Sequence, residues 1–265
     1  MAEVLLSPGV LARENDQSFL QAQPIQAGAA ILGPTVKGPV GIPTLVTTYS
    51  KYQNKFGTVV ESGSAEYTYF TSISAYNYFQ QGGDSLLVTR VVSGSYTPAS
   101  SSLIANSNTS ASFVLETISE GVEMNSTGSE DSNTGALATG SKDNVRWEIV
   151  SPNTSSGTFS LLIRRGNDIT TSKTVLETWA NLSLDPNASN YIEKVIGNSK
   201  QEVASDASTG EYYIKNSGTY NTLSNYVRVK SVLTPTLNFF DNSGTAKSSF
   251  TGSIPVAGSG SFGAA

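Results

Sequence analysis

The order of apolar and polar positions separates a region with both strand and helix patterns from a later region of strand patterns. Residues 29–32 form a short, continuous apolar run, which predicts a buried strand. Residues 45–47 are rich in branched side chains and predict a second strand. The prolines and glycines between the two runs predict irregular structure. A short helix is expected next, capped by Thr48 or Ser50 and ended by Gly57.

Residues 66–81 carry the clearest helical pattern. One broad face of this helix would contain six mostly aromatic or apolar side chains: Tyr69, Phe70, Ile73, Tyr76, Phe79 and Gln80. An aromatic-rich face is more often core than binding groove, so we expect it to be buried. Residues 86–92 are almost wholly apolar and predict a strand covered on both faces. Arg90 lies inside this strand, and its charge is expected to reach an interface or a carboxylate, because an unpaired buried charge is costly.

A shift to serine, threonine and asparagine over residues 93–112 marks a domain boundary. Beyond this boundary, strand patterns occur at 113–118, 145–149, 159–163, 173–182 and 226–232. A short helix is predicted at 190–199, before the last of these strands. The predicted fold class is α+β and β-rich, with a mixed α/β N-terminal portion and an inserted, mainly antiparallel β outer domain. Residues of roughly 100–240 are expected to fold cooperatively alone, whereas the first 95 are not.

Composition excludes several classes of function. The formal net charge is −5 and the sequence pI is about 4.8, which argues against a nucleic-acid partner. The chain has no histidine and no cysteine, so a Ser-His-Asp triad, a Cys-His pair, a histidine-ligated metal and a disulfide are all excluded. We expect no metal and no cofactor. No apolar run approaches the roughly 20 residues of a membrane span, and the N-terminus does not read as a signal peptide, so synthesis in the cytosol is expected.

Three local patterns suggest chemistry and are weak. Gly33 and Gly38 have the spacing of a phosphate loop, but Pro39 stands where the lysine is needed and removes a backbone donor. A carbohydrate-binding or adhesin-like β module would use Trp147 and Trp179 as stacking platforms, although Trp147 alternates with apolar neighbours and is expected in a core. A hydrolase with paired carboxylates would draw on four acids without a clear constellation: Glu116, Glu148, Asp168 and Glu177.

Five short motifs occur in an order that resembles the contractile tail sheath proteins of tailed bacteriophages. Together they span about ninety residues of the N-terminal portion. They are Ser7-Pro8-Gly9-Val10 with Glu14; Gly33 with Lys37-Gly38-Pro39; Lys55-Phe56-Gly57; residues 75–83; and the strand at 86–92, which includes Arg90.

The resemblance implies a non-enzymatic structural subunit of a phage tail, which polymerises in stacked rings around a tail tube and contracts to drive the tube through the host envelope. Its partners would be copies of itself, the tail tube protein, and baseplate or terminator proteins. Residues 1–26 would form an extended arm to a neighbouring subunit, and the strand-like spacing of Val4, Leu6, Pro8 and Val10 fits that role. Residues 27–95 would belong to the sheath core domain and 105–235 to the outer domain. The Gly/Ser-rich residues 236–265 would be a linker towards a C-terminal part that the sequence lacks.

Overall fold

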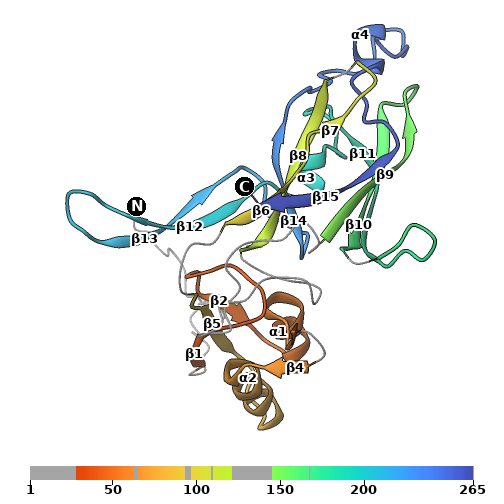
Figure 1. Ribbon diagram of the computed structural model, residues 1–265. Helices are drawn as coiled ribbons and strands as arrows, with labels where there is room; N and C mark the ends of the chain where they lie inside the picture. Colours follow the sequence, from red (N-terminus) through yellow and green to blue (C-terminus); the bar gives the residue numbers. More distant parts are fainter. Residues whose placement is uncertain are drawn as a thin grey trace, which may run out of the picture.

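The computed structural model describes residues 28–62, 65–92, 97–108, 110–120, 145–166 and 168–264. We call residues 28–92 the core region and residues 97–264 the outer region. Figure 1 shows the core region, coloured red to orange-brown, below the strands of the outer region, coloured yellow to blue. The fold is α+β and β-rich, as the sequence predicted.

The core region is a small mixed sheet with two helices on one side. Its elements are β1 (Ala29–Gly33), β2 (Thr44–Val46), α1 (Tyr49–Phe56), β3 (Val59–Ser62), β4 (Ala65–Thr68), α2 (Phe70–Gln80) and β5 (Leu86–Arg90). The strand order is β1-β5-β2, with β1 parallel and β2 antiparallel to the central β5. Strands β3 and β4 form a separate two-stranded hairpin.

The outer region is built on an eight-stranded sheet. Its elements are β6 (Pro98–Ser101), β7 (Ile104–Ala105), β8 (Ala111–Glu120), β9 (Val145–Asn153), β10 (Thr158–Arg165), β11 (Val175–Ser183), α3 (Ile192–Val195), β12 (Lys200–Ser205), β13 (Tyr212–Ser217), β14 (Val227–Val232), α4 (Ser248–Thr251) and β15 (Gly258–Ala264). The main order is β11-β10-β9-β15-β6-β8-β14, and β7 pairs with β8. Each strand pattern predicted from the sequence in this region overlaps an observed strand.

The last strand, β15, lies in the middle of this sheet and corrects the prediction of a linker. Gly260 pairs with Trp147 of β9, and Ala264 pairs with Ala99 of β6. The chain therefore returns beside the strand through which it enters the outer region. Glycine suits this position because a Cβ on Gly260 would lie 2.7 Å from the indole of Trp147.

The first helix forms as the sequence predicted. The Thr48 hydroxyl accepts the backbone N–H of Lys51 at 3.2 Å, and Gly57 ends the helix with a φ of 70°. Tyr52 and Phe56 point from α1 onto the sheet and are fully buried. These two rings occupy most of the space above the sheet, and of the aromatic side chains of α2 only Tyr78 and Phe79 pack against this cluster, partly buried, within the described residues.

The second helix differs from its prediction in both extent and orientation. Residues 65–68 form β4, so the helix begins at Phe70. It packs through small side chains at Thr71, Ser72 and Ala75, and the Ser72 hydroxyl lies 3.0 Å from that of Tyr52. The aromatic face expected in the core lies largely outside it: Phe70 is 87 % exposed, and Ile73 and Tyr76 are also exposed.

The prediction that β5 is covered on both faces is wrong for the described part of the chain. Leu86 and Val88 are buried under the helices and Arg90 is buried at the end of the strand, whereas Leu87 is exposed on the opposite face. Strand β1 alternates in the same way, and Leu32 is 71 % exposed, so it is not the buried strand expected. Among the described residues, the sheet of the core region thus has one covered face and one apolar face that no other described element covers.

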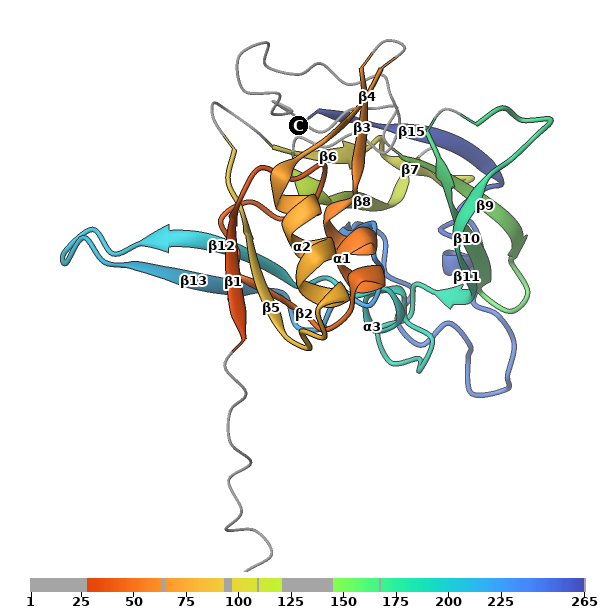
Figure 2. The same ribbon diagram turned by 90° about the horizontal axis from the view of Figure 1, so that it is seen from below.

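The hairpin of β12 and β13 was not predicted. It extends away from α1 and α2 in both views of the molecule (Figures 1 and 2). Two-stranded sheets in water are marginally stable unless something packs against them. Its strands alternate polar and apolar residues too weakly for a sequence pattern to reveal them.

Candidate functional site: the junction of the two regions

The loop of residues 34–43, which we call the junction loop, connects β1 to β2 and lies where the two regions meet. Its conformation is fixed from the core side. The backbone N–H of Lys37 donates to the carbonyl oxygen of Phe56 at 3.0 Å. Gly38 has a φ of 113° and lies so close to the Phe56 ring that a Cβ there would be 2.7 Å from Cδ1. Only glycine fits both the backbone angle and the close approach.

Three hydrogen bonds join the junction loop and β5 to the end of β8 in the outer region, and a fourth joins β5 to the junction loop itself. The N–H of Gly38 donates to the Ser119 hydroxyl at 3.1 Å, and the N–H of Val40 donates to the Glu120 carboxylate at 3.2 Å. The buried Arg90 guanidinium donates to the carbonyl oxygens of Glu120 and of Gly38, the latter at 2.8 Å. Arg90 therefore does reach an interface, as predicted, but its hydrogen-bond acceptors are backbone carbonyls.

Two further charged groups are partly desolvated at this junction. The Lys37 ammonium lies 5.2 Å from the centre of the Tyr226 ring, and burial lowers the pKa of Lys37 to about 8. Burial also raises the pKa of Glu120, although the Val40 N–H and the charges of Lys200 and Arg90 favour its ionised form. The contact between the regions is thus polar and partly buried.

Gly33, Gly57 and Pro39, three further residues of the motifs, lie at or beside the same place. Gly33 pairs with Arg90 in the parallel ladder, and a Cβ on Gly33 would lie 2.5 Å from the Thr71 hydroxyl. Gly57 lies directly against Val36, and Pro39 lines the adjoining cavity. The structure thus brings together all seven proposed core residues: Gly33, Lys37, Gly38, Pro39, Phe56, Gly57 and Arg90. The proposed arm residues, Val4, Leu6, Ser7, Pro8, Gly9, Val10 and Glu14, lie outside the described residues.

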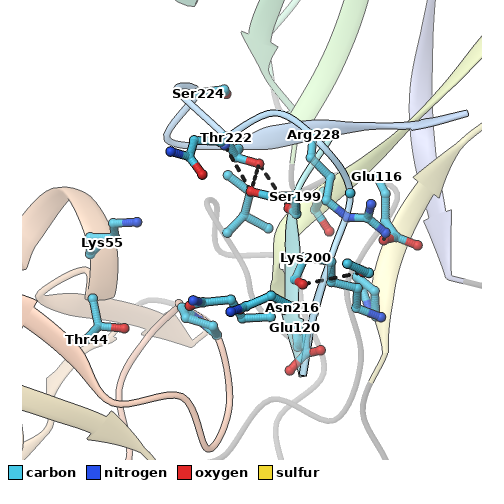
Figure 3. A pocket seen from close by; sticks show the side chains of 18 of the residues that line it. Thr44, Lys55, Glu116, Glu120, Ser199, Lys200, Asn216, Thr222, Ser224 and Arg228 are labelled. Carbon is cyan, nitrogen blue, oxygen red and sulfur yellow. Dashed lines mark hydrogen bonds and ion pairs between the residues drawn. The ribbon is translucent and has the colours of Figure 1, made fainter. Parts of the chain in front are cut away.

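A cavity of about 550 Å³ adjoins the junction (Figure 3). Thr44 and Lys55 line it from the core region, and Lys200 and Asn216 line it from the root of the β12–β13 hairpin. Glu116 and Arg228 close the side formed by β8 and β14. The cavity therefore lies between elements of both regions.

The acidic groups of this cavity are held by neighbouring donors. Glu116 forms ion pairs with Arg228 and with Lys230, the latter at 3.3 Å, and is nearly buried. Glu120 accepts the Val40 N–H described above. These carboxylates hold neighbouring strands and loops together, because cationic side chains or backbone N–H groups already occupy their lone pairs.

The four acids of the hydrolase hypothesis lie in three separate places. Only Glu116 lines the cavity. Glu148 and Asp168 both bind the buried Arg164, at 3.1 and 2.7 Å. Glu177 accepts hydrogen bonds from Trp179 and Ser224. No pair of these four carboxylates faces a common substrate space.

The Arg164 cluster is a buried ion-pair group of the outer region. The Arg164 side chain is 2 % exposed and lies inside the sheet. Burial alone raises the pKa of Asp168, but hydrogen bonds and charge from Arg164 outweigh it and lower the pKa overall. Trp147, proposed for carbohydrate stacking in the rival hypothesis, is buried in the core of the outer region, where the sequence predicted it.

Within the described ranges, no three or more potential metal-ligating residues gather at one place. The described helices are also too short or too polar to span a bilayer.

Comparison with solved structures finds several similar chains, including the following two. One is a sheath tail protein from Listeria innocua, with 10 % identity over 88 % of this chain and 34 % of that chain, and a TM-score of 0.35. The other comes from Desulfitobacterium hafniense, with 12 % identity over 84 % of this chain and 39 % of that chain, and a TM-score of 0.32. Both are sheath tail proteins. This is the family that the sequence motifs resemble.

The chain spans little more than a third of the length of these two proteins. No family model matches the chain, and no curated protein matches it by sequence. The TM-scores are too low to carry an argument about function, which therefore rests on the residues of this chain.

Sequence reasoning missed the outer-region half of the junction. Ser119, Glu120 and Tyr226 meet the junction loop from positions about 80 to 190 residues further along the chain. Neither spacing nor motif links residues that far apart. The one available signal was Arg90 itself, whose buried charge required partners from somewhere.

Proposed function

We propose that this protein is a structural subunit of a contractile phage tail sheath and acts without catalysis. The observation that carries the proposal is the convergence of the motif residues. Gly38, Phe56 and Arg90 are far apart in the sequence, yet they meet at one junction that fastens the outer region to the core region. The order of the motifs in the sequence, and the common location of these three residues, support one shared purpose.

The junction suits a subunit that must transmit force. Arg90 is anchored in the central strand of the core region and donates directly to the last residue of β8 in the outer region. Buried charge-assisted hydrogen bonds of this kind are directional and costly to break without replacement. The outer region would therefore keep its orientation while whole subunits move past one another during contraction.

The finer parts of the proposal are self-assembly in stacked rings around a tail tube, contacts with baseplate or terminator proteins, and location in the virion tail. Residues 1–26 would act as an arm to a neighbouring subunit. In this view, the energy for contraction comes from repacking between subunits.

Electron microscopy of negatively stained, purified protein tests the proposal. We expect long, transversely striated tubes, with the full-length gene product as the sample of choice. Featureless monomers over a wide range of concentration and salt would contradict a sheath role. A glycan array is the matching test of the rival carbohydrate-binding function, for which we expect no specific signal.

A further inference from the structure

The core region carries apolar surfaces on two opposite sides. On one side, the open face of the β1-β5-β2 sheet carries Leu32, Leu45 and Leu87, of which Leu32 is 71 % and Leu45 63 % exposed. A sheet face open to water normally carries polar residues. We call this surface the leucine face.

On the other side, α2 carries the second surface. Phe70, Ile73 and Tyr76 follow one another at intervals of three residues and are exposed, and Tyr67 continues the line at the end of β4. They point away from the helix side that packs on the sheet through Thr71, Ser72 and Ala75. The helix contains no charged residue. We call this surface the aromatic stripe.

The β12–β13 hairpin overhangs the core region on the side away from the helices (Figures 1 and 2). Cross-strand pairing places Val203 opposite Ile214 and Ser205 opposite Tyr212, so one face of the hairpin carries Val203, Tyr212 and Ile214 among polar, uncharged residues. This is also the more exposed face. Val203 lies 3.2 Å from the Cβ position of Gly41, so this face begins at the junction loop, close to the strand that carries Leu45.

We propose that a second copy of this chain places its aromatic stripe on the leucine face, below the hairpin, so that copies join head to tail. Each surface is uncharged, and one is a helix ridge while the other is a sheet face, a combination that packs well in proteins. Because the two surfaces lie on opposite sides of one region, each bound copy leaves a new leucine face or stripe available. Such a heterologous contact builds rings or open filaments.

The charges around these surfaces favour the same partner. Helix α1, which packs beside α2, carries Lys51 and Lys55 and no acidic residue. The tip of the hairpin carries Asp206 and Glu211, both exposed. In a head-to-tail pair, the hairpin of one copy extends over the helices of the next, and its acidic tip meets the basic helix. The inference deepens the proposed function and rests on it for the identity of the partner as a second copy.

Paired variants test this contact by sedimentation velocity. Leu32→Glu with Leu45→Glu blocks the leucine face, and Phe70→Glu with Ile73→Glu blocks the stripe. These side chains are exposed, so folding is expected to survive, which circular dichroism checks. We expect each double variant to remain monomeric at concentrations about 100-fold above those at which the unmodified chain associates, as loss of central apolar anchors predicts. The matched control, Leu103→Glu with Leu237→Glu, alters equally exposed leucines of the outer region and is expected to associate normally.

Mixing the two blocked variants is the decisive measurement. Each retains one intact surface, so a head-to-tail contact predicts one-to-one pairs and nothing larger. A mixture that stays monomeric overturns the proposal, as does association of the stripe variant alone, which would indicate a symmetric sheet-to-sheet dimer. An unmodified chain that is monomeric, and that loses thermal stability when the leucine face is changed, also overturns it, because another part of the same chain would then cover that face. Should a double variant misfold, Leu45→Glu and Ile73→Glu alone replace it.

The same samples separate this proposal from the sheath function. Tubes formed equally by the unmodified chain and both blocked variants would refute the contact and leave the sheath function standing. One-to-one pairs in the mixture, together with no tubes from the unmodified chain under any condition, would support the contact and contradict the sheath function.

Discussion

The guanidinium of Arg90 donates a hydrogen bond to the carbonyl oxygen of Gly38 at 2.8 Å, and so ties the central strand of the core region to the junction loop. The same guanidinium binds the carbonyl oxygen of Glu120 at the end of β8. One buried cation thus holds three segments from two regions.

Replacement of Arg90 by methionine removes these bonds while keeping an unbranched side chain of similar length. Hydrogen bonds of charged groups contribute ~1.5–3 kcal/mol each, and the carbonyls would be left buried. We expect the free energy of unfolding to fall by about 3 kcal/mol or more, measured by urea denaturation. Lys215→Met on the exposed hairpin is the control, with an expected change of about 0.5 kcal/mol or less. Equal effects of the two substitutions would show that Arg90 does not fasten the junction.

Gly38→Ala tests the close packing of the junction loop on α1. A methyl group there meets the Phe56 ring, and the φ of 113° is unfavourable for alanine. Gly82→Ala shares the positive φ, of 86°, but has open space around it. Strain in the backbone alone costs ~1–2 kcal/mol, and overpacking adds ~1–3 kcal/mol. Gly38→Ala is therefore expected to lower the thermal midpoint clearly more than Gly82→Ala, and similar midpoints would contradict the packing argument.

The sequence predicted local structure where the signals are local. Thr48 and Gly57 bound α1 because a cap and a helix stop act within a few residues. The strand patterns at 145–149 and 159–163 were predicted from local sequence, and they lie in β9 and β10, which pair as antiparallel neighbours. For the candidate site, the motif residues could be named in advance, although their meeting at one junction could not.

The failures have one physical source, which is competition for space between distant segments. Phe70 and Tyr76 have the spacing of a buried face, yet Tyr52 and Phe56 occupy that space first. Residues 258–264 are mostly glycine, serine and alanine and suggest a linker. They form a central strand because Gly260 accommodates the indole of Trp147. Periodicity within a segment cannot reveal which neighbour will fill a gap.

For the proposed arm, the free energies of hydrogen bonding, chain ordering and side-chain burial predict which residues hold it to a neighbouring subunit. If residues 4–10 add as a strand to a neighbouring subunit, about five hydrogen bonds at ~0.5–1.5 kcal/mol each do not offset ordering costs of ~1–2 kcal/mol per residue. Burial of Val4, Leu6 and Val10 must then supply the balance. We expect Val4→Asp with Leu6→Asp to abolish tube formation while leaving the melting temperature of the monomer nearly unchanged. Normal tubes from this variant would show that the arm is not the link between subunits.

The lowered pKa of Lys37 predicts that the free energy of unfolding rises under mildly alkaline conditions. Its pKa is about 8 in the folded protein and 10.5 ordinarily. Below pH 8 the ammonium is charged in both states, and the folded state bears the cost of burying it. As the pH rises through this window, the folded protein releases the proton first, so the free energy of unfolding increases, by about 3 kcal/mol at most.

Urea denaturation at about pH 7.5 and about pH 9 measures this rise while most tyrosines remain protonated. Lys37→Met is the reference, because it keeps the side-chain length and removes the titrating group. We expect the difference in stability between the unmodified chain and Lys37→Met to shift in favour of the unmodified chain as the pH increases. A difference that stays constant between the two pH values would show that Lys37 is hydrated in the folded protein.

The position of β15 predicts which fragment of the outer region folds alone. The sequence suggested that residues 100–240 suffice, but β15 lies between β9 and β6 and joins the two halves of the eight-stranded sheet. Phe262 of β15 is fully buried in the core of the outer region. Without this strand, two strand edges and part of the core lose their cover. We therefore expect residues 97–264 to unfold cooperatively and residues 97–251 not to fold.

Fluorescence of Trp147 during urea denaturation follows both fragments, because Gly260 of β15 covers its indole. Within the longer fragment, Phe262→Ala should lower the free energy of unfolding by ~3–5 kcal/mol, the usual range for a buried phenylalanine. Gly258→Ala is the matched change in the same strand, with open space around the added methyl group, and should be nearly neutral. A cooperative transition of residues 97–251 with an unchanged midpoint would show that β15 is an accessory strand and restore the shorter domain boundary.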